Sequence, residues 1–260
     1  MTEVTKFTIL LLVAVTLIIL LLIAGPLPQP QWYHNFADKR MVWLIPNFYN
    51  VVTNGIFLIV GIIGVFYLKS PVASKKLCFK TPQEKWFYFI FFLATLFVSV
   101  GSSYYHWQPE NATLVYDRLP MTIAFMSLFT AIIAERINRR AGLILLPICT
   151  VLGLATIFYW QVTQDLRPYI FVQFYPMLAI PLMLLMYRPS YSGVSWLWFA
   201  LLLYFLAKVT ETFDGYLYHL TAETISGHSL KHILAGFSCW FVLLYLQKRH
   251  LMRLDVDSNF

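Results

Sequence analysis

Charged residues are scarce in this sequence. Of the 260 residues, only 12% are Asp, Glu, Lys or Arg, whereas 59% are hydrophobic. Soluble globular domains carry about 25% charged residues and at most about 50% apolar ones. The composition therefore excludes an ordinary soluble domain and favours an integral membrane protein.

Cysteine is also scarce, with three residues in the whole chain. Cys149 and Cys239 lie inside apolar runs, and Cys78 lies in a basic loop. This spacing matches neither a disulfide framework nor a cysteine-based metal motif. We assign the cysteines no role.

The sequence does contain repeated apolar runs of about 20 residues, the length that crosses ~30 Å of hydrocarbon. Breaks rich in Pro, Gly or charge separate them. They predict an all-α, polytopic membrane helical bundle with no soluble domain. The expected spans are 7–25, 47–69, 85–106, 118–137, 141–160, 168–187, 194–213 and 228–247.

The first run is open to two interpretations. It has the position of a signal peptide, but its apolar stretch is long for one and Glu3 stands in front of it. We expect a retained N-terminal transmembrane helix within residues 1–26.

The distribution of lysine and arginine predicts the orientation. If the eight spans alternate, four basic residues fall on one side, namely Lys39, Arg40, Arg118 and Arg167. Thirteen fall on the other side, namely Lys6, Lys69, Lys75, Lys76, Lys80, Lys85, Arg136, Arg139, Arg140, Arg188, Lys248, Arg249 and Arg253. The positive-inside rule places the thirteen, both termini and a tail at 249–260 in the cytoplasm. The net charge of +7 is then a topology signal and not a nucleic-acid surface.

Two histidines stand at the start of the span at 228–247. His228 and His232 are four residues apart, so a helix places both imidazoles on one face, where they can reach one metal ion. The alternative is a pair of histidines hydrogen-bonded to neighbouring helices. Ionisable residues inside a membrane are functional candidates by default, which favours the metal.

A second polar cluster lies at residues 101–121, "GSSYYHWQPENATLVYDRLPM". His106 ends one span and Asp117 precedes the next, so both are expected at the same membrane level as His228 and His232. Three histidines with one open position are typical of a catalytic zinc site. Neutral imidazole also suits copper, iron and nickel.

Asp117 and Ser102 each have a structural alternative. Asp117 precedes an expected helix start, where aspartate is a good cap, and the sequence favours neither cap nor catalyst. Ser102 shares a helical face with His106, four residues on. It also belongs to the small-residue stretch "SVGSS" (99–103), which suits close helix packing.

Further polar residues have weaker claims on the site. Lys208 and Glu211 are three residues apart, and we expect a buried ion pair that cancels its own charge. His34 and His219 are expected on the same side as the metal layer and are alternative ligands, although neither has a helical partner four residues away.

These residues together resemble the alkaline ceramidases of the CREST superfamily of membrane hydrolases. The likeness rests on "GSSYYH", "YDRLPM" and "GHSLKH", with "IPNFYNVVTNGIF" (45–57) similar to the family's first core helix. It implies a seven-helix hydrolase core at about 45–248, preceded by one extra helix. It also implies zinc on the three histidines, with Asp117 and Ser102 acting in catalysis.

The chain departs from that family in two places. The segment before the first core helix, "WYHNFADKRMVW", offers Asp38 as its only carboxylate, whereas calcium prefers six to eight oxygen ligands. We therefore expect no calcium. Arg118 also stands where the family has an acidic residue, which affects the substrate more than the reaction.

The expected function is zinc-dependent hydrolysis of a lipid amide, splitting a ceramide-like substrate at the outer membrane–water interface. The bilayer and a membrane lipid are the expected partners. The alternative from another class is a seven-helix receptor or sensor with a structural zinc and no turnover. Haem is disfavoured, because His228 and His232 share one helical face whereas two axial ligands must face each other.

Overall fold

The computed structural model describes residues 1–71 and 78–252, and in these residues the chain is helical, with two isolated β-bridges and no strand. Three basic residues used for the orientation, Lys75, Lys76 and Arg253, lie outside the described residues. So does the part of the expected tail from residue 253 onward.

The all-α prediction is confirmed in the described residues, and eight helices there are long and apolar enough to cross a membrane, as a multi-pass membrane protein requires. Two short helices between spans were not predicted, the 3₁₀ helix η1 (Gln31–His34) and α10 (Asp214–Leu220). The spans are α1 (Glu3–Ile23), α2 (Phe48–Val52) with α3 (Gly55–Lys69), η2 (Pro82–Glu84) with α5 (Lys85–Trp107), α6 (Asn111–Arg136), α7 (Arg139–Thr163), α8 (Arg167–Met186), α9 (Val194–Thr212) and α11 (Gly227–Lys248).

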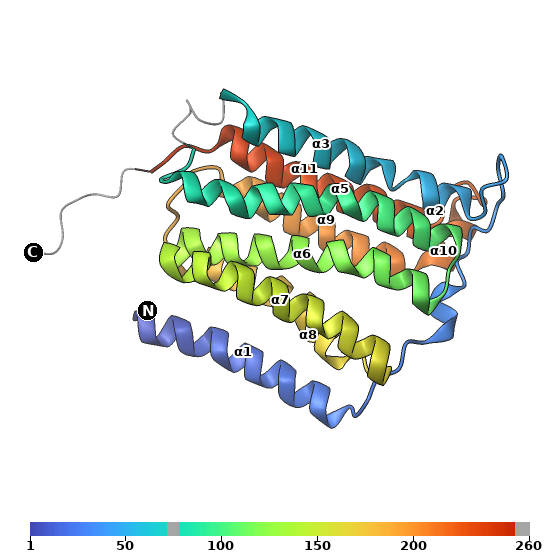
Figure 1. The fold of residues 1–260 in the computed structure, drawn as a ribbon, viewed down its shortest axis with the longest axis horizontal. Helices are drawn as coiled ribbons and strands as arrows, with labels where there is room; N and C mark the ends of the chain where they lie inside the picture. The colour runs from blue at the N-terminus through green and yellow to red at the C-terminus, as the bar shows by residue number, and fades with distance from the viewer. Residues whose placement is uncertain (72–77, 253–260) are drawn as a thin grey trace, which may run out of the picture.

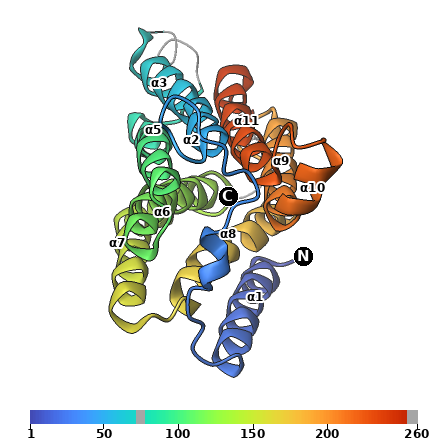
Figure 2. The same ribbon diagram turned by 90° about the vertical axis from the view of Figure 1, so that its right-hand side faces the viewer.

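Six of the spans form a closed ring in which each packs on the next: α3, α5, α6, α8, α9 and α11, with α11 returning to α3. α7 lies outside the ring against α6 and α8 (Figure 2). The start of α1 and the end of α11 lie at one end of the bundle, and α2, α10 and the start of α11 lie at the other (Figure 1). We call the second end the histidine end.

α1 stands at the edge of the bundle, beside α8 (Figure 2). Leu10 is its only buried residue. Its polar contacts are few: the Tyr175 hydroxyl donates to the Leu10 carbonyl at 3.3 Å, and Lys6 Nζ lies 4.7 Å from the centre of the Tyr187 ring. α1 therefore contributes no side chain to the interior of the ring.

The span predicted at 47–69 is broken into α2 and α3 at Thr53 and Asn54. The Thr53 hydroxyl donates to the Tyr49 carbonyl at 2.7 Å, and Asn54 Nδ2 donates to the Asn50 carbonyl at 2.8 Å. Such local side-chain bonds compete with helical backbone bonds. The break places Thr53 beside the histidines.

α6 begins seven residues earlier than the predicted span at 118–137. Its first turn is held by Thr113, whose hydroxyl accepts the Glu110 backbone N–H at 3.3 Å. Asp117 therefore lies within the helix and not at its start. The interpretation of Asp117 as a helix cap is wrong.

A buried ion pair closes the end of the bundle opposite the histidine end. Arg249 Nη1 pairs with Glu135 Oε1, and Arg249 is only 3% exposed. The hydroxyls of Tyr88 and Tyr245 each donate to Glu135 at 2.7 Å. The tail predicted at 249–260 thus starts with a residue that belongs to the core.

Candidate metal centre

Three buried imidazoles meet at the histidine end. His106 comes from the last turn of α5, and His228 and His232 come from the first two turns of α11. His106 Nε2 lies 3.1 Å from His232 Nε2 and 3.3 Å from His228 Nε2. Within the described residues these are the one group of three or more potential ligands gathered around a point, with ligand atoms within 4.8 Å of one another. The expected convergence is confirmed.

Two of the nitrogen separations fit a metal ion. A tetrahedral centre with metal–nitrogen bonds of about 2.05 Å sets its ligand nitrogens about 3.3 Å apart. His106 Nε2 lies at 3.1 and 3.3 Å from the other two Nε2 atoms, which matches that edge, and the three ligand atoms lie within 4.8 Å of one another. All three imidazoles are almost fully buried, so water cannot satisfy these nitrogens in the way it does at a surface.

Thr53 fixes the tautomer of His232. Its hydroxyl donates its one hydrogen to the Tyr49 carbonyl, and the hydroxyl oxygen lies 3.0 Å from His232 Nδ1. The Thr53 oxygen must therefore accept a hydrogen from Nδ1, which leaves Nε2 unprotonated toward the other histidines. Supporting partners of this kind orient metal ligands in proteins.

Two further side chains position the backbone around the ligands. Asn47 Nδ2 donates to the His106 carbonyl at 2.9 Å. Asp214 accepts the His228 backbone N–H at 2.7 Å and the Ala37 N–H at 2.9 Å, which joins the start of α11 to the segment after η1. Asp214 could not be predicted from the sequence, because an aspartate between two spans carries no distinguishing signal.

Gly101 and Gly227 permit the close helix approach that the site needs. A Cβ at Gly101 would lie 2.0 Å from the Tyr116 carbonyl oxygen, and one at Gly227 would lie 2.2 Å from the Thr210 carbonyl oxygen. Within the stretch "SVGSS", Gly101 is thus the residue that lets α5 pack closely against α6. Its neighbour Ser102 lines a cavity instead.

Asp117 and Ser102 lie on neighbouring helices, α6 and α5, which pack against each other. Both are buried, at 5% and 3% exposure, and both line the same cavity as His232. A carboxylate, a hydroxyl and an unprotonated imidazole nitrogen therefore share one buried space.

The expected ion pair of Lys208 with Glu211 is confirmed, but it belongs to a larger network. Lys231 Nζ contacts Glu211 Oε1 at 2.9 Å and His228 Nε2 at 3.1 Å. The Tyr33 hydroxyl also donates to Glu211, at 3.1 Å. Burial, and then the charge of Glu211, raise the pKa of the Tyr33 phenol, so Tyr33 remains a donor. Two lysines thus share one carboxylate beside His228.

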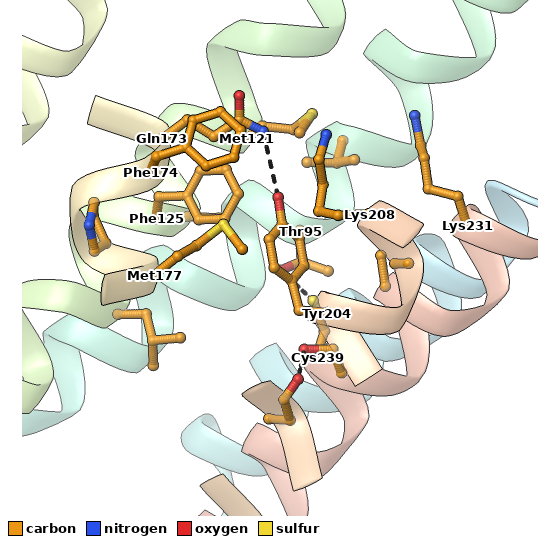
Figure 3. A pocket seen from close by; sticks show the side chains of 18 of the residues that line it. Thr95, Met121, Phe125, Gln173, Phe174, Met177, Tyr204, Lys208, Lys231 and Cys239 are labelled. Atoms are coloured by element: carbon orange, nitrogen blue, oxygen red, sulfur yellow. Dashed lines mark hydrogen bonds between the residues drawn. The ribbon is translucent and has the colours of Figure 1, made fainter. Parts of the chain in front are cut away.

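The polar groups stand at one end of a cavity of about 250 Å³. Away from them its lining is mostly apolar, with Phe125, Phe174 and Met177 in view (Figure 3). Along α5 the lining runs from Ser102 to Phe91, a depth of about 16 Å at 1.5 Å per residue. The cavity is therefore elongated and mostly apolar, with charged side chains at one end.

The two alternative histidines are not ligands. His34 is held by the Tyr105 hydroxyl at 2.9 Å and the Asn111 side-chain oxygen at 2.8 Å. His219 is exposed at the end of α10.

Both carboxylate oxygens of Asp38, in the segment considered for calcium, are engaged by Arg40. The expectation that the protein needs no calcium stays a prediction.

Comparison with known proteins adds no relative: no protein-family profile, no curated protein and no solved structure matches this chain.

Proposed function

We propose that this protein is a zinc-dependent hydrolase that cleaves the amide bond of a ceramide-like membrane lipid, releasing a fatty acid and a sphingoid-type amine. One observation carries the proposal. Three buried histidines converge with their ligand atoms within 4.8 Å of one another, and one of them, His232, lines a mostly apolar cavity together with Asp117 and Ser102.

His106, His228 and His232 would hold the metal. Three histidines with an open position are the ligand set of catalytic zinc sites. Zinc in such a site lowers the pKa of a water molecule to near 7 and polarises a carbonyl. The contact of Thr53 with His232 Nδ1 would leave His232 Nε2 free to bind the metal.

Asp117 and Ser102 would carry the proton transfers. Asp117 accepts a proton from water as the water oxygen forms a bond to the amide carbon. Ser102 donates a hydrogen bond to the carbonyl oxygen while negative charge develops there. Asp117 then returns the proton to the amide nitrogen as the C–N bond breaks, so one water is consumed and an acid and an amine leave.

Glu211 would keep the charge beside the ligands in balance. Lys231 lies 3.1 Å from His228 Nε2, where an unpaired cation would repel a metal ion. Glu211 binds Lys231 and Lys208 together, and its own burial makes this pairing strong. The network acts by positioning Lys231 and not by contacting the scissile bond.

The fit to a lipid rests on the shape of the cavity. A lipid amide lies near the membrane interface with its chains in the hydrocarbon, and the cavity runs from the charged end into the apolar interior of the ring. The proposed orientation puts the histidine end outside, with both termini in the cytoplasm.

Cysteine labelling tests that orientation. Trp32 is 73% exposed beside the histidine end, and Lys80 is exposed at the other end. An impermeant thiol reagent on intact cells should label Trp32→Cys and leave Lys80→Cys at the background of the wild-type cysteines. The reverse pattern would place the site on the cytoplasmic side.

The decisive experiment measures metal and turnover in the same purified sample. Elemental analysis should give near one zinc per chain, and a ceramide should be hydrolysed. A strong zinc chelator should stop hydrolysis and added zinc restore it, whereas a calcium-selective chelator should have no effect. Asp165→Asn, a change at a buried aspartate outside the cavity, is the matched control for Asp117→Asn.

The receptor or sensor alternative makes a different prediction for the same sample. A structural zinc needs a fourth protein ligand, and the group found in the described residues has three members. Bound zinc without hydrolysis of any lipid amide in a screen would favour the sensor.

A further inference from the structure

A second layer of polar side chains lies inside the apolar part of the cavity, and we call Thr95, Gln173, Tyr204 and Cys239 the deep polar layer (Figure 3). Three of them are each seven residues from a group of the metal centre: Thr95 from Ser102, Tyr204 from Glu211, and Cys239 from His232. Seven residues are about two helical turns, so each pair shares a face at a separation of about 10.5 Å. Three helices thus carry polar groups at one common depth.

The contacts within the deep polar layer leave hydrogen-bonding capacity unused. Gln173 Nε2 reaches the Tyr204 hydroxyl only at 3.5 Å, and Thr95 lies 4.0 Å from Cys239 Sγ. Among the described residues, the Gln173 side-chain oxygen accepts no hydrogen bond and the Tyr204 O–H donates none. Thr95 is satisfied by the Phe91 carbonyl at 2.8 Å. One acceptor and one donor therefore remain free on the cavity wall.

Unpaired polar groups are expensive at this depth. Gln173 is only 8% exposed, and the wall around it is built from Met121, Phe125, Phe174 and Met177 (Figure 3). A polar group in an apolar environment without its hydrogen bonds costs about 1–3 kcal/mol by mutational measures. A pair that served only to hold α8 to α9 would be expected to lie at an ordinary hydrogen-bond distance of about 2.7–3.2 Å.

We propose that the deep polar layer binds an oxygen substituent, a hydroxyl above all, on the acyl chain of the lipid substrate. The Gln173 oxygen accepts the substrate O–H, and the Tyr204 hydroxyl donates to the same oxygen. This inference rests on the proposed function, because it places the amide carbonyl at the metal centre.

The distance between the layers predicts the position of the substituent. With C–C bonds of about 1.5 Å, an extended alkyl chain advances about 1.25 Å per carbon. The ~10.5 Å between the layers then corresponds to about eight or nine carbons beyond the carbonyl. The substrate class is a lipid amide whose fatty acyl chain is hydroxylated near its middle.

Binding of fatty acids to the zinc-loaded protein in detergent micelles tests this by calorimetry, without turnover. The probes are octadecanoic acid, its isomer hydroxylated at the tenth carbon and its isomer hydroxylated at the second carbon. The mid-chain hydroxyl should tighten binding about three- to ten-fold over the plain acid, the value of one or two ordinary hydrogen bonds. Equal affinity of wild type for these two acids would overturn the inference.

Variants show whether the deep polar layer is responsible. Tyr204→Phe, which removes one oxygen, and Gln173→Leu should abolish the preference for the mid-chain hydroxyl and leave binding of the other two acids unchanged. Met177→Leu, an apolar change in the same wall, is the control and should keep the preference. A preference that survives both polar changes would also overturn the inference.

Turnover separates this inference from the proposed function. Hydrolysis of plain and mid-chain-hydroxylated amides at equal kcat/KM would remove the substrate assignment and keep the hydrolase. Selective binding of the hydroxylated acid by a protein that hydrolyses neither amide would keep the deep polar layer and remove the hydrolase.

Discussion

The two ends of the bundle each bury a cluster of ionisable groups, and they treat them differently. At the end opposite the histidines, both oxygens of Glu135 are occupied, by Arg249, Tyr88 and Tyr245. The Arg249 guanidinium also lies over the Tyr191 ring, 4.1 Å from its centre. The opposite charges are paired there within the protein, and both carboxylate oxygens receive donors, although Arg249 Nη2 has no hydrogen-bond partner among the described residues.

At the histidine end, like groups converge. Three imidazoles approach one another, with Thr53 beside His232 Nδ1 and Lys231 Nζ 3.1 Å from His228 Nε2. Asp117 lines a cavity that reaches into the ring. The difference teaches that burial of charge alone does not indicate function. What distinguishes the histidine end is a convergence of potential metal ligands beside a cavity in which a substrate could bind.

The largest expected effect is at the histidine end. His232→Ala removes one of three ligands, so bound metal should fall from near one per chain to near zero and hydrolysis should stop. Elemental analysis of the purified variant measures this. A His219→Ala control should retain the metal, since His219 is exposed and outside the cluster. Full metal content in His232→Ala would mean that other residues hold the ion.

Asp117→Asn should lower hydrolysis by about 10²-fold or more, the scale of a lost general base. The amide keeps the size of the carboxylate but cannot accept the proton. Metal content and melting temperature should barely change, because Asp117 is neither one of the clustered ligands nor a helix cap. Undiminished turnover in this variant would mean that Asp117 is a structural residue and not a catalytic one.

Glu135→Gln should show the reverse pattern, with stability lost and metal kept. Breaking a buried pair leaves Arg249 as an uncompensated charge, which costs about 3–5 kcal/mol. The melting temperature in detergent should fall accordingly. Adding Arg249→Met should recover much of the loss. If the double variant were no more stable than the single one, the pair would not be the source of the cost.

Thr53→Val should have the smallest effect of the four. It removes the acceptor for His232 Nδ1 while preserving side-chain shape, and losing such a partner weakens metal binding by about 10–100-fold. Titration with a competing chelator measures the affinity. Thr163→Val, at an exposed helix end, is the control. An unchanged affinity would mean that packing alone orients His232.

The spans were predictable from sequence because twenty-residue apolar runs have one stable form in a bilayer. The start of α6 was not, because Glu110, Asn111 and Asp117 look like loop residues by polarity. Residues 111–117 form the first two turns of α6, where Glu110 and Thr113 cap the first turn and Asp117 reaches the cavity. The break at Thr53 was equally invisible, since both halves are apolar.

The histidines were predictable from spacing, because residues four apart share a helical face and alternating spans set their level. The support around them was not. Asp214, Asn47 and Thr53 act through contacts with residues far away in the chain, such as the Asn47 amide on the His106 carbonyl. Lys231 stands out in the sequence as a cation inside an apolar run. Its ion pair with Glu211 was not predictable, because that pair depends on the packing of α9 against α11.

The ligands come from helices made at very different times. His106 and His232 are 126 residues apart in the chain. During synthesis α5 enters the membrane with a lone imidazole, and the next two ligands arrive only when α11 inserts between α9 and α3. Metal capture therefore reports that the ring has closed. If the histidines hold a metal ion as proposed, a nascent or misassembled chain would lack both the ion and the proposed activity, so correct folding and activity would depend on the same event.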